Sequence, residues 1–201
     1  MKVVLLGAFV AIAILVSYAV VWSRLNYPYG ATHACSKGLA MELRGYAEDD
    51  GHWFPHGAST PEASFGLLYT NDLERATHML AGKTIPQKVV RARLRQFGTI
   101  SPDTCGWHYV EGLRDDDDPQ IIVAWDKAIG LSHNGQRKDG LMHEVIRVDG
   151  LDELIGKERW PEFIADQKKR LAQLIASRDS NAPPIRWSDE ESLGPNRLSP
   201  K

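Results

Sequence analysis

The chain has 201 residues, and its 24 basic and 26 acidic side chains leave a formal net charge of −2. This balance excludes a large electrostatic field that would draw the protein to nucleic acid, so we expect no nucleic-acid partner. One short basic segment, residues 88–96, is typical of a solvated helix face. Without an apolar start and a polar end, about 150 residues remain, which is the usual size of one domain.

The first predicted element is an apolar run, residues 3–22, which contains neither charge nor proline. As a helix it is long enough to cross a hydrocarbon core of roughly 30 Å. Trp22 at its end and Arg24 just after it are typical of a membrane interface. We therefore expect residues 1–24 to form a single-pass anchor in the inner (cytoplasmic) membrane, with the rest of the chain on the extracytoplasmic (periplasmic) side. A signal peptide cleaved after Ala19 is the alternative.

A linker, residues 25–33, contains a proline and a glycine that break the helix, and it leads into one domain expected over residues 34–178. The first half of this domain predicts short helices, because apolar residues recur at spacings of three and four. Ser59 or Thr60 caps the second of these helices, and Thr84 caps the last. The expected helices cover residues 34–50, 59–69, 70–80 and 84–97.

Two cysteines, Cys35 and Cys105, lie far apart in the sequence and have no C-x-x-C spacing. A redox motif or a zinc site is therefore poorly supported. In an oxidising compartment such a pair most simply forms one disulfide, which would close a loop of about 70 residues. Two free buried thiols are the alternative.

The second half of the domain predicts an antiparallel sheet. Residues 106–113 and 120–126 are rich in β-branched and aromatic side chains, and they flank an acidic turn, residues 114–119. This pattern indicates a hairpin. Residues 141–150 alternate in the manner of a third strand.

The end of the chain reads as two helices and a tail. Residues 151–156 predict a short helix, and residues 159–177 predict a longer one with its apolar face turned inward. Residues 179–201 contain four prolines and few apolar side chains, which is typical of a flexible tail. The expected fold class is therefore α+β, with a single N-terminal transmembrane helix and helices packed on a small antiparallel sheet.

The order of these elements resembles pilin-like or pseudopilin-like proteins of type II secretion, of the G-like planctomycete and verrucomicrobial type. The likeness covers about residues 34–175 and is carried by turn and packing residues. In the first motif these are Cys35, Leu39, Tyr46, Ala47, Asp49 or Asp50, Gly51 and Pro55, and in the second Ala124, Trp125, Asp126, Lys127, His133, Gly135, Asp149 and Gly150.

The resemblance implies a non-enzymatic, structural or interacting component of the cell envelope or of a secretion apparatus, whose partners are other pseudopilin or secretion-system subunits. Members of the family carry a Glu at the fifth position of the processed helix. A cut after Gly7 would place Ile12 at that position, and the anchor has no carboxylate. We therefore expect a pilin-like domain on a plain anchor, or a minor component that does not polymerise.

A rival interpretation is a membrane-anchored enzyme or metal-binding protein that uses the loops of residues 115–150. It would require Asp126, His133, Asp139 and His143 to converge, with Glu144 and Asp149 nearby in sequence. The spacing does not fit a helical zinc motif, and no phosphate-binding loop or nucleophile elbow is present. His133 beside Gly135 is more typical of a turn. We expect no catalytic residue and no cofactor.

Calcium binding is the metal alternative for the acidic turn between the two strands of the predicted hairpin. Four consecutive acids could supply the oxygen ligands that a hard cation prefers. A solvated turn is the more ordinary interpretation of such a run. The candidate ligands are Asp115, Asp116, Asp117 and Asp118.

Overall fold

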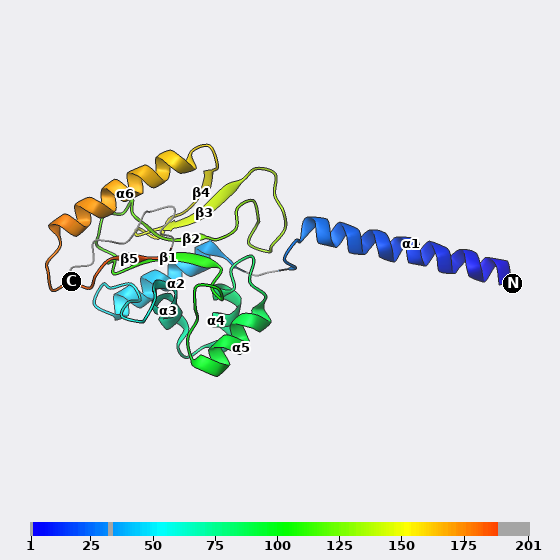
Figure 1. Cartoon of the computed structure of the whole chain (residues 1–201), viewed down its shortest axis with the longest axis horizontal. Helices are drawn as coiled ribbons and strands as arrows, with labels where there is room; N and C mark the ends of the chain where they lie inside the picture. Colours follow the sequence, from blue (N-terminus) through cyan, green and yellow to red (C-terminus); the bar gives the residue numbers. More distant parts are fainter. Residues whose placement is uncertain (1, 32–33, 189–201) are drawn as a thin grey trace.

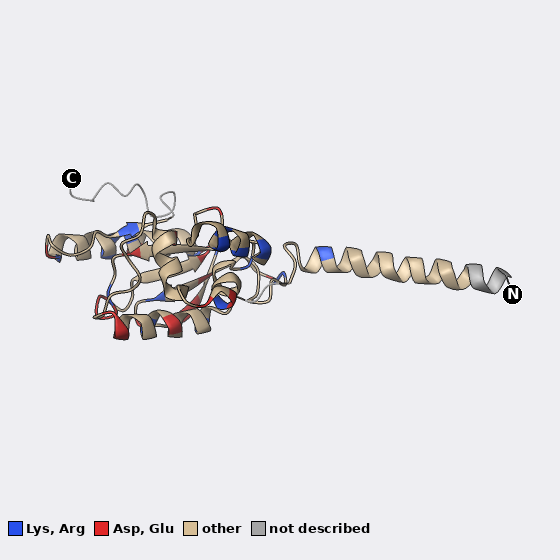
Figure 2. Ribbon diagram, turned by 90° about the horizontal axis from the view of Figure 1, so that it is seen from below, with Lys and Arg blue, Asp and Glu red and all other residues tan. Residues whose placement is uncertain are grey.

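The computed structural model describes residues 2–31 and 34–188, and it is an α+β structure with one helix standing apart from a folded domain (Figure 1). That helix, α1 (Lys2–Asn26), projects away from the domain, and its residues 7–25 are exposed. By length and hydropathy it could span a membrane. Apart from its grey end, it shows a single charged position in Figure 2, whereas the domain carries both signs interspersed.

The helix ends in a turn that is tied to the domain. The N–H group of Gly30 donates to the carbonyl of Tyr27 over 3.0 Å, and Gly30 has a φ of +85°, which glycine adopts without strain. Asn26 accepts a hydrogen bond from the backbone of Arg137 at 2.7 Å. The base of α1 is therefore held against the loop between two strands of the sheet.

The sheet has five antiparallel strands in the order β4-β3-β2-β1-β5. The predicted hairpin and the predicted third strand are confirmed, since the first three strands pair in sequence order. The strands are β1 (Trp107–Glu111), β2 (Ile122–Asp126), β3 (Met142–Arg147), β4 (Asp152–Gly156) and β5 (Arg186–Trp187).

Helices cover both faces of the sheet (Figure 1). One helix, α6, lies on one side and contacts β4. The other helices of the domain, α2 to α5, lie on the opposite side, where α2 contacts β3 and β4 and α3 contacts β1. The helices are α2 (Ser36–Asp49), α3 (Pro61–Gly66) with a 3-10 turn η1 (Leu67–Tyr69), α4 (Leu73–Leu80), α5 (Gln87–Phe97) and α6 (Trp160–Ser177).

The first residues of the helices agree only in part with those predicted from the sequence. Thr60 caps α3 as predicted, because its hydroxyl accepts a hydrogen bond from the N–H of Ala63 at 3.1 Å. The start predicted at Thr84 is wrong. Pro86 precedes α5 instead, and Gly98 ends that helix in the left-handed conformation.

The core between the helices and the sheet is aromatic. Trp107 and Trp125 are buried, and the ring of Tyr109 stacks on that of Phe65 with centroids 4.7 Å apart. The indole N–H of Trp107 donates to the carbonyl of Met79 at 2.8 Å, and the hydroxyl of Tyr109 donates to the carbonyl of Pro55 at 2.8 Å. These tryptophans are therefore packing residues.

The segment of residues 151–156 is a strand, and the helix predicted there is wrong. It pairs with β3 over five residues, from Met142 opposite Gly156 to Ile146 opposite Asp152. A six-residue segment is too short for periodicity to separate a helix from a strand, so pairing with β3 decides its conformation.

The flexible tail predicted over residues 179–201 is corrected in its first part. Residues 186–187 form β5, which pairs with β1 so that Trp187 lies opposite Val110. Ile185 and Trp187 are only 5% and 7% exposed. Burial of these two side chains offsets the entropy of ordering the proline-containing segment. The rest of the predicted tail, residues 189–201, lies outside the described residues.

Candidate functional site

A buried cluster of charged side chains lies at one end of the sheet, where three segments meet. Lys83 comes from the loop between α4 and α5, Asp126 is the last residue of β2, and Glu144 lies within β3. The lysine loop is fixed by its neighbours, because Gly106 donates a backbone hydrogen bond to Leu80 at 2.8 Å. The fold therefore brings together groups that are far apart in the sequence.

The lysine contacts two carboxylates at once. Its Nζ lies 2.7 Å from Oδ2 of Asp126 and 2.6 Å from Oε2 of Glu144. The contact with Asp126 is an aligned hydrogen bond, whereas the oxygen of Glu144 is close but not aligned. The side chains of Lys83 and Asp126 are 2% and 1% exposed, and that of Glu144 is 13% exposed. This lysine is buried together with an excess of negative charge.

The remaining carboxylate oxygens also have partners. Oδ1 of Asp126 accepts a hydrogen bond from the backbone N–H of Glu144 at 3.2 Å. The hydroxyl of Ser36, at the start of α2, donates to Oε1 of Glu144 at 2.6 Å and lies 3.2 Å from Oδ2 of Asp152. The network therefore joins α2, the lysine loop and three strands, which holds its members in fixed positions.

His143 approaches the same cluster from the opposite face of the sheet. Its Nδ1 lies 3.5 Å from Oδ1 of Asp126, and its ring stacks on Trp160 of α6 with centroids 3.7 Å apart. Its neighbour Glu144 faces α2, as expected for successive residues of a strand. Asp126 is thus contacted from both faces because it ends its strand.

Of the four residues that an enzyme would have to bring together, the structure places only Asp126 and His143 in contact. His133 and Asp139 are exposed on the loop between β2 and β3, where the carbonyl of His133 accepts a hydrogen bond from Ala34 at 2.9 Å. Asp149 shapes the turn before β4 through a hydrogen bond from the N–H of Leu151 at 2.9 Å.

Sequence reasoning missed Lys83, the residue at the centre of the cluster. A signal was present, since a lone lysine follows the buried pair Leu80 and Ala81 and the turn residue Gly82. Gly82 has a φ of +57°, and this bend turns the following side chain toward the sheet end. Its two partners, however, cannot be read from sequence neighbours.

The four acids of the turn between β1 and β2 do not converge on one point. Each contacts a different basic side chain: Asp115 pairs with His52 at 2.8 Å, Asp116 with Arg114 at 2.6 Å, Asp117 with Arg178 at 2.5 Å, and Asp118 with Arg170 at 2.6 Å. Within the described residues, no group of three or more His, Cys, Asp or Glu side chains could hold a metal ion. The calcium alternative therefore has no geometric support.

Two of these ion pairs, those with Arg170 and Arg178, fasten the turn to α6 and to the end of that helix. The hydrogen bond from Arg114 lowers the pKa of Asp116. Burial opposes ionisation of Asp118, but the N–H of Gln120 and the guanidinium of Arg170 lower its pKa in total. The turn is therefore a structural connection.

The predicted disulfide is absent, because Cys35 and Cys105 are both free thiols in the structure. Cys35 is partly exposed just before α2, whereas Cys105 is fully buried just before β1. Burial raises the pKa of the Cys105 thiol to about 12. A buried thiol in apolar surroundings is unreactive, so it serves as a packing residue.

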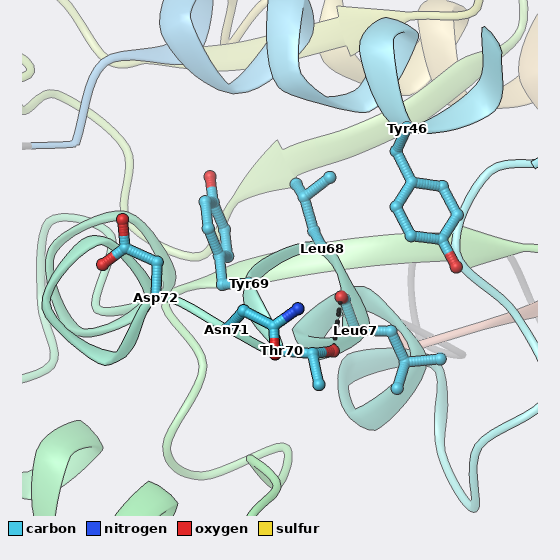
Figure 3. A pocket seen from close by; sticks show the side chains of 7 residues that line it. All are labelled: Tyr46, Leu67, Leu68, Tyr69, Thr70, Asn71 and Asp72. Atoms are coloured by element: carbon cyan, nitrogen blue, oxygen red, sulfur yellow. Dashed lines mark hydrogen bonds between the residues drawn. The ribbon is translucent and has the colours of Figure 1, made fainter. Parts of the chain in front are cut away.

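Three cavities on the α2–α5 side of the sheet are lined by residues outside the charged cluster. One of about 470 Å³ lies between Tyr46 and residues 67–72, and two others of about 550 and 380 Å³ lie nearby. In Figure 3 the hydroxyl of Thr70 donates to the carbonyl of Leu67 at 2.8 Å. Tyr69 donates its hydroxyl proton to Glu42, and burial raises its pKa. The hydroxyl groups of Tyr69 and Thr70 are therefore already engaged within the domain.

No family model matches this chain, and neither a curated protein nor a solved structure matches it. Function therefore has to be inferred from two features, the exposed apolar helix and the charged cluster at the sheet end.

Proposed function

We propose that the protein is a membrane-anchored, pseudopilin-like structural or interacting component of the cell envelope or of a secretion apparatus, with its domain on the extracytoplasmic side. The observation that carries this proposal is α1, which is apolar and exposed over residues 7–25 beside a domain with its own core. An exposed apolar surface of this length is stable in lipid and costly in water.

The arrangement of the domain is compatible with a pilin-like role. Its first helix, α2, packs against an antiparallel sheet built from hairpins, and it starts immediately after Cys35, where the motif of the resemblance begins. The helix does not continue from the anchor, since α1 ends at Asn26. This break, together with the anchor's lack of a carboxylate, favours a minor component over a fibre-forming one.

A non-enzymatic role is supported by the positions of the candidate catalytic groups. His133 and Asp139 lie exposed on a loop, away from the buried Asp126. The acids of the β1–β2 turn are held in ion pairs with His52 and three arginines. The ion-paired acids of this turn stabilise the domain.

Membrane insertion is tested with the full chain in its native membranes. We expect the protein to resist extraction at alkaline pH and its domain to be digested by protease added outside the inner membrane. Leu15→Arg, near the middle of α1, should release the chain, because an arginine there costs roughly 2.5–3.5 kcal/mol. Ser23→Arg, near the end of the helix, is the matched control and should stay inserted. Extraction of the unchanged protein, or a protected domain, would contradict the proposal.

The interaction role is tested by cross-linking in the same membranes. We expect links to pseudopilin or other secretion-system subunits, identified by mass spectrometry of the linked peptides. A protein found only as a monomer would contradict a role in such an apparatus.

A further inference from the structure

We propose that Lys83 and Asp126 become joined by an intramolecular amide bond, with Glu144 moving the proton. The proposal rests on the geometry of the sheet-end cluster and is independent of the proposed function. It requires an amine, a carboxyl group and a proton carrier in contact, shielded from water. All three groups are present at this end of the sheet.

The two reacting groups are already in position. Nζ of Lys83 lies 2.7 Å from Oδ2 of Asp126, so the nitrogen is next to the carboxyl group whose carbon it would attack. Lys83 is held by a loop fixed to β1, and Asp126 by its place in β2. Holding two reactants in contact removes the entropy cost of bringing them together, which can accelerate a reaction by many orders of magnitude.

Glu144 is placed to move the proton. Its Oε2 lies 2.6 Å from Nζ, so it can accept one proton from the ammonium group and leave a nucleophilic amine. Glu144 passes this proton to Oδ2 of Asp126, and the amine attacks the carboxyl carbon. Glu144 then takes a second proton from the attacking nitrogen and passes it to the same oxygen, so that Oδ2 leaves as water with both protons. The ammonium and carboxylate groups are converted into an amide and one water molecule, and Glu144 is unchanged at the end. The step needs no oxidant or other co-reactant.

The other oxygen of Asp126 is placed to carry the charge that develops during attack. Its Oδ1 accepts the backbone N–H of Glu144 at 3.2 Å, and Nδ1 of His143 lies 3.5 Å away. A fixed donor at this oxygen stabilises the negative charge of the tetrahedral intermediate. Oδ1 then becomes the carbonyl oxygen of the amide, with the same donor.

The surroundings favour the amide over the ion pair. The side chains of Lys83 and Asp126 are only 2% and 1% exposed, and Trp125, which precedes Asp126, is buried as well. Separated charges are costly in such an environment, whereas an amide with hydrogen-bond partners is not. Exclusion of water also slows the reverse hydrolysis.

The matched comparison within the same chain is the pair Lys127 and Glu62. These side chains also form an ion pair, at 3.3 Å, and Glu62 is 1% exposed. The lysine is 19% exposed, however, and it donates to the carbonyl of Pro102 at 2.6 Å. We expect this pair to remain ionic.

The test is mass spectrometry of the full chain purified from membranes, after complete unfolding and tryptic digestion. We expect the peptides of residues 76–88 and 115–127 to be found as one species, lighter by about 18 Da than their sum, with no cleavage after Lys83. A linked peptide is needed because an Asp-Gly sequence, such as residues 139–140, can also lose water. No link should join Lys127 to Glu62.

Two variants separate the roles of the residues. Lys83→Arg keeps the positive charge and should abolish the linked peptide. Glu144→Gln keeps the size of the side chain but cannot carry the proton, so the linked fraction should fall at least tenfold in freshly synthesised protein. Detection of the linked peptide in the unchanged protein requires no variant, so it tests the amide bond even if a variant folds poorly. Separate, unmodified peptides in the unchanged protein would overturn the proposal.

Discussion

Gly106 lies so close to Ala81 that a Cβ atom on Gly106 would be 2.2 Å from the carbonyl oxygen of Ala81. This contact presses the loop that carries Lys83 against the start of β1. We expect Gly106→Ala to force the two segments apart and to lower the free energy of unfolding by at least about 2 kcal/mol. Urea denaturation followed by circular dichroism measures the change.

The matched control for this substitution is Gly45→Ala. Gly45 is exposed in α2, and a Cβ there would meet nothing within 4 Å. Alanine in a helix interior is favoured over glycine, so this variant should gain roughly 0.5–1 kcal/mol. Equal changes in the free energy of unfolding for the two variants would show that the close contact between Gly106 and Ala81 does not restrict the side chain at residue 106.

Removal of the Lys83 nitrogen should be strongly destabilising, because Lys83→Met loses the amide link to Asp126 and the ion pair from which it forms. Both buried carboxylates are then left without their partner, which typically costs about 3–5 kcal/mol for a buried ion pair. The exposed pair Arg91 and Glu74 provides a control, since Arg91→Met should change stability by less than about 1 kcal/mol. Thermal or urea unfolding distinguishes the two.

A second variant tests the reason for that cost. Combining Lys83→Met with Asp126→Asn and Glu144→Gln removes the uncompensated charges, so part of the lost stability should return. A triple variant less stable than Lys83→Met alone would show that charge burial is not the cause.

The sheet could be predicted only where its signal is local. In residues 107–126, β-branched and aromatic side chains on both sides of a charged turn predict a hairpin, and β1 and β2 pair as expected. The strands β4 and β5 form because they pair with β3 and β1. Asp152–Gly156 is too short for a pattern, and Arg186–Trp187 is ordered by pairing with β1 and by burial of Trp187.

The charged cluster could be predicted even less well than the sheet. One polar window of the sequence contains Asp126, His143 and Glu144, so these three residues can be recognised as candidates. Lys83 lies 43 residues before Asp126, and only the close approach of Gly82 to Gly106 brings its loop to the sheet end. Such a contact depends on tertiary packing, which has no periodic signal along the chain.

The two cysteines should react differently in the native protein. Cys35 is partly exposed, whereas Cys105 is fully buried as a protonated thiol. Without reductant, a thiol reagent should therefore label Cys35 alone in the native state and both cysteines after unfolding. Two unreactive cysteines in the unfolded, unreduced chain would instead demonstrate a disulfide.

The Cys105 thiol should also make stability depend on alkaline pH. Burial raises its pKa from 9.0 to about 12, so the folded state retains a proton that the unfolded chain loses. Its contribution is complete below pH 9 and is lost as the pH rises toward 12, by up to about 1.4 kcal/mol per pH unit. The free energy of unfolding should fall more steeply across this window in the unchanged protein than in Cys105→Ala. Parallel profiles would contradict this origin.

The segment after α6 should be needed for stability. Trp187 is 7% exposed and its strand adds the fifth position of the sheet beside β1. Trp187→Ala would leave a cavity between that strand and its neighbours, so we expect a loss of about 3–5 kcal/mol in the free energy of unfolding. Asn181→Ala, at an exposed position of the same segment, is the control and should change it by less than about 0.5 kcal/mol. If Trp187→Ala were as stable as Asn181→Ala, the segment would be a tail that contributes nothing to the core.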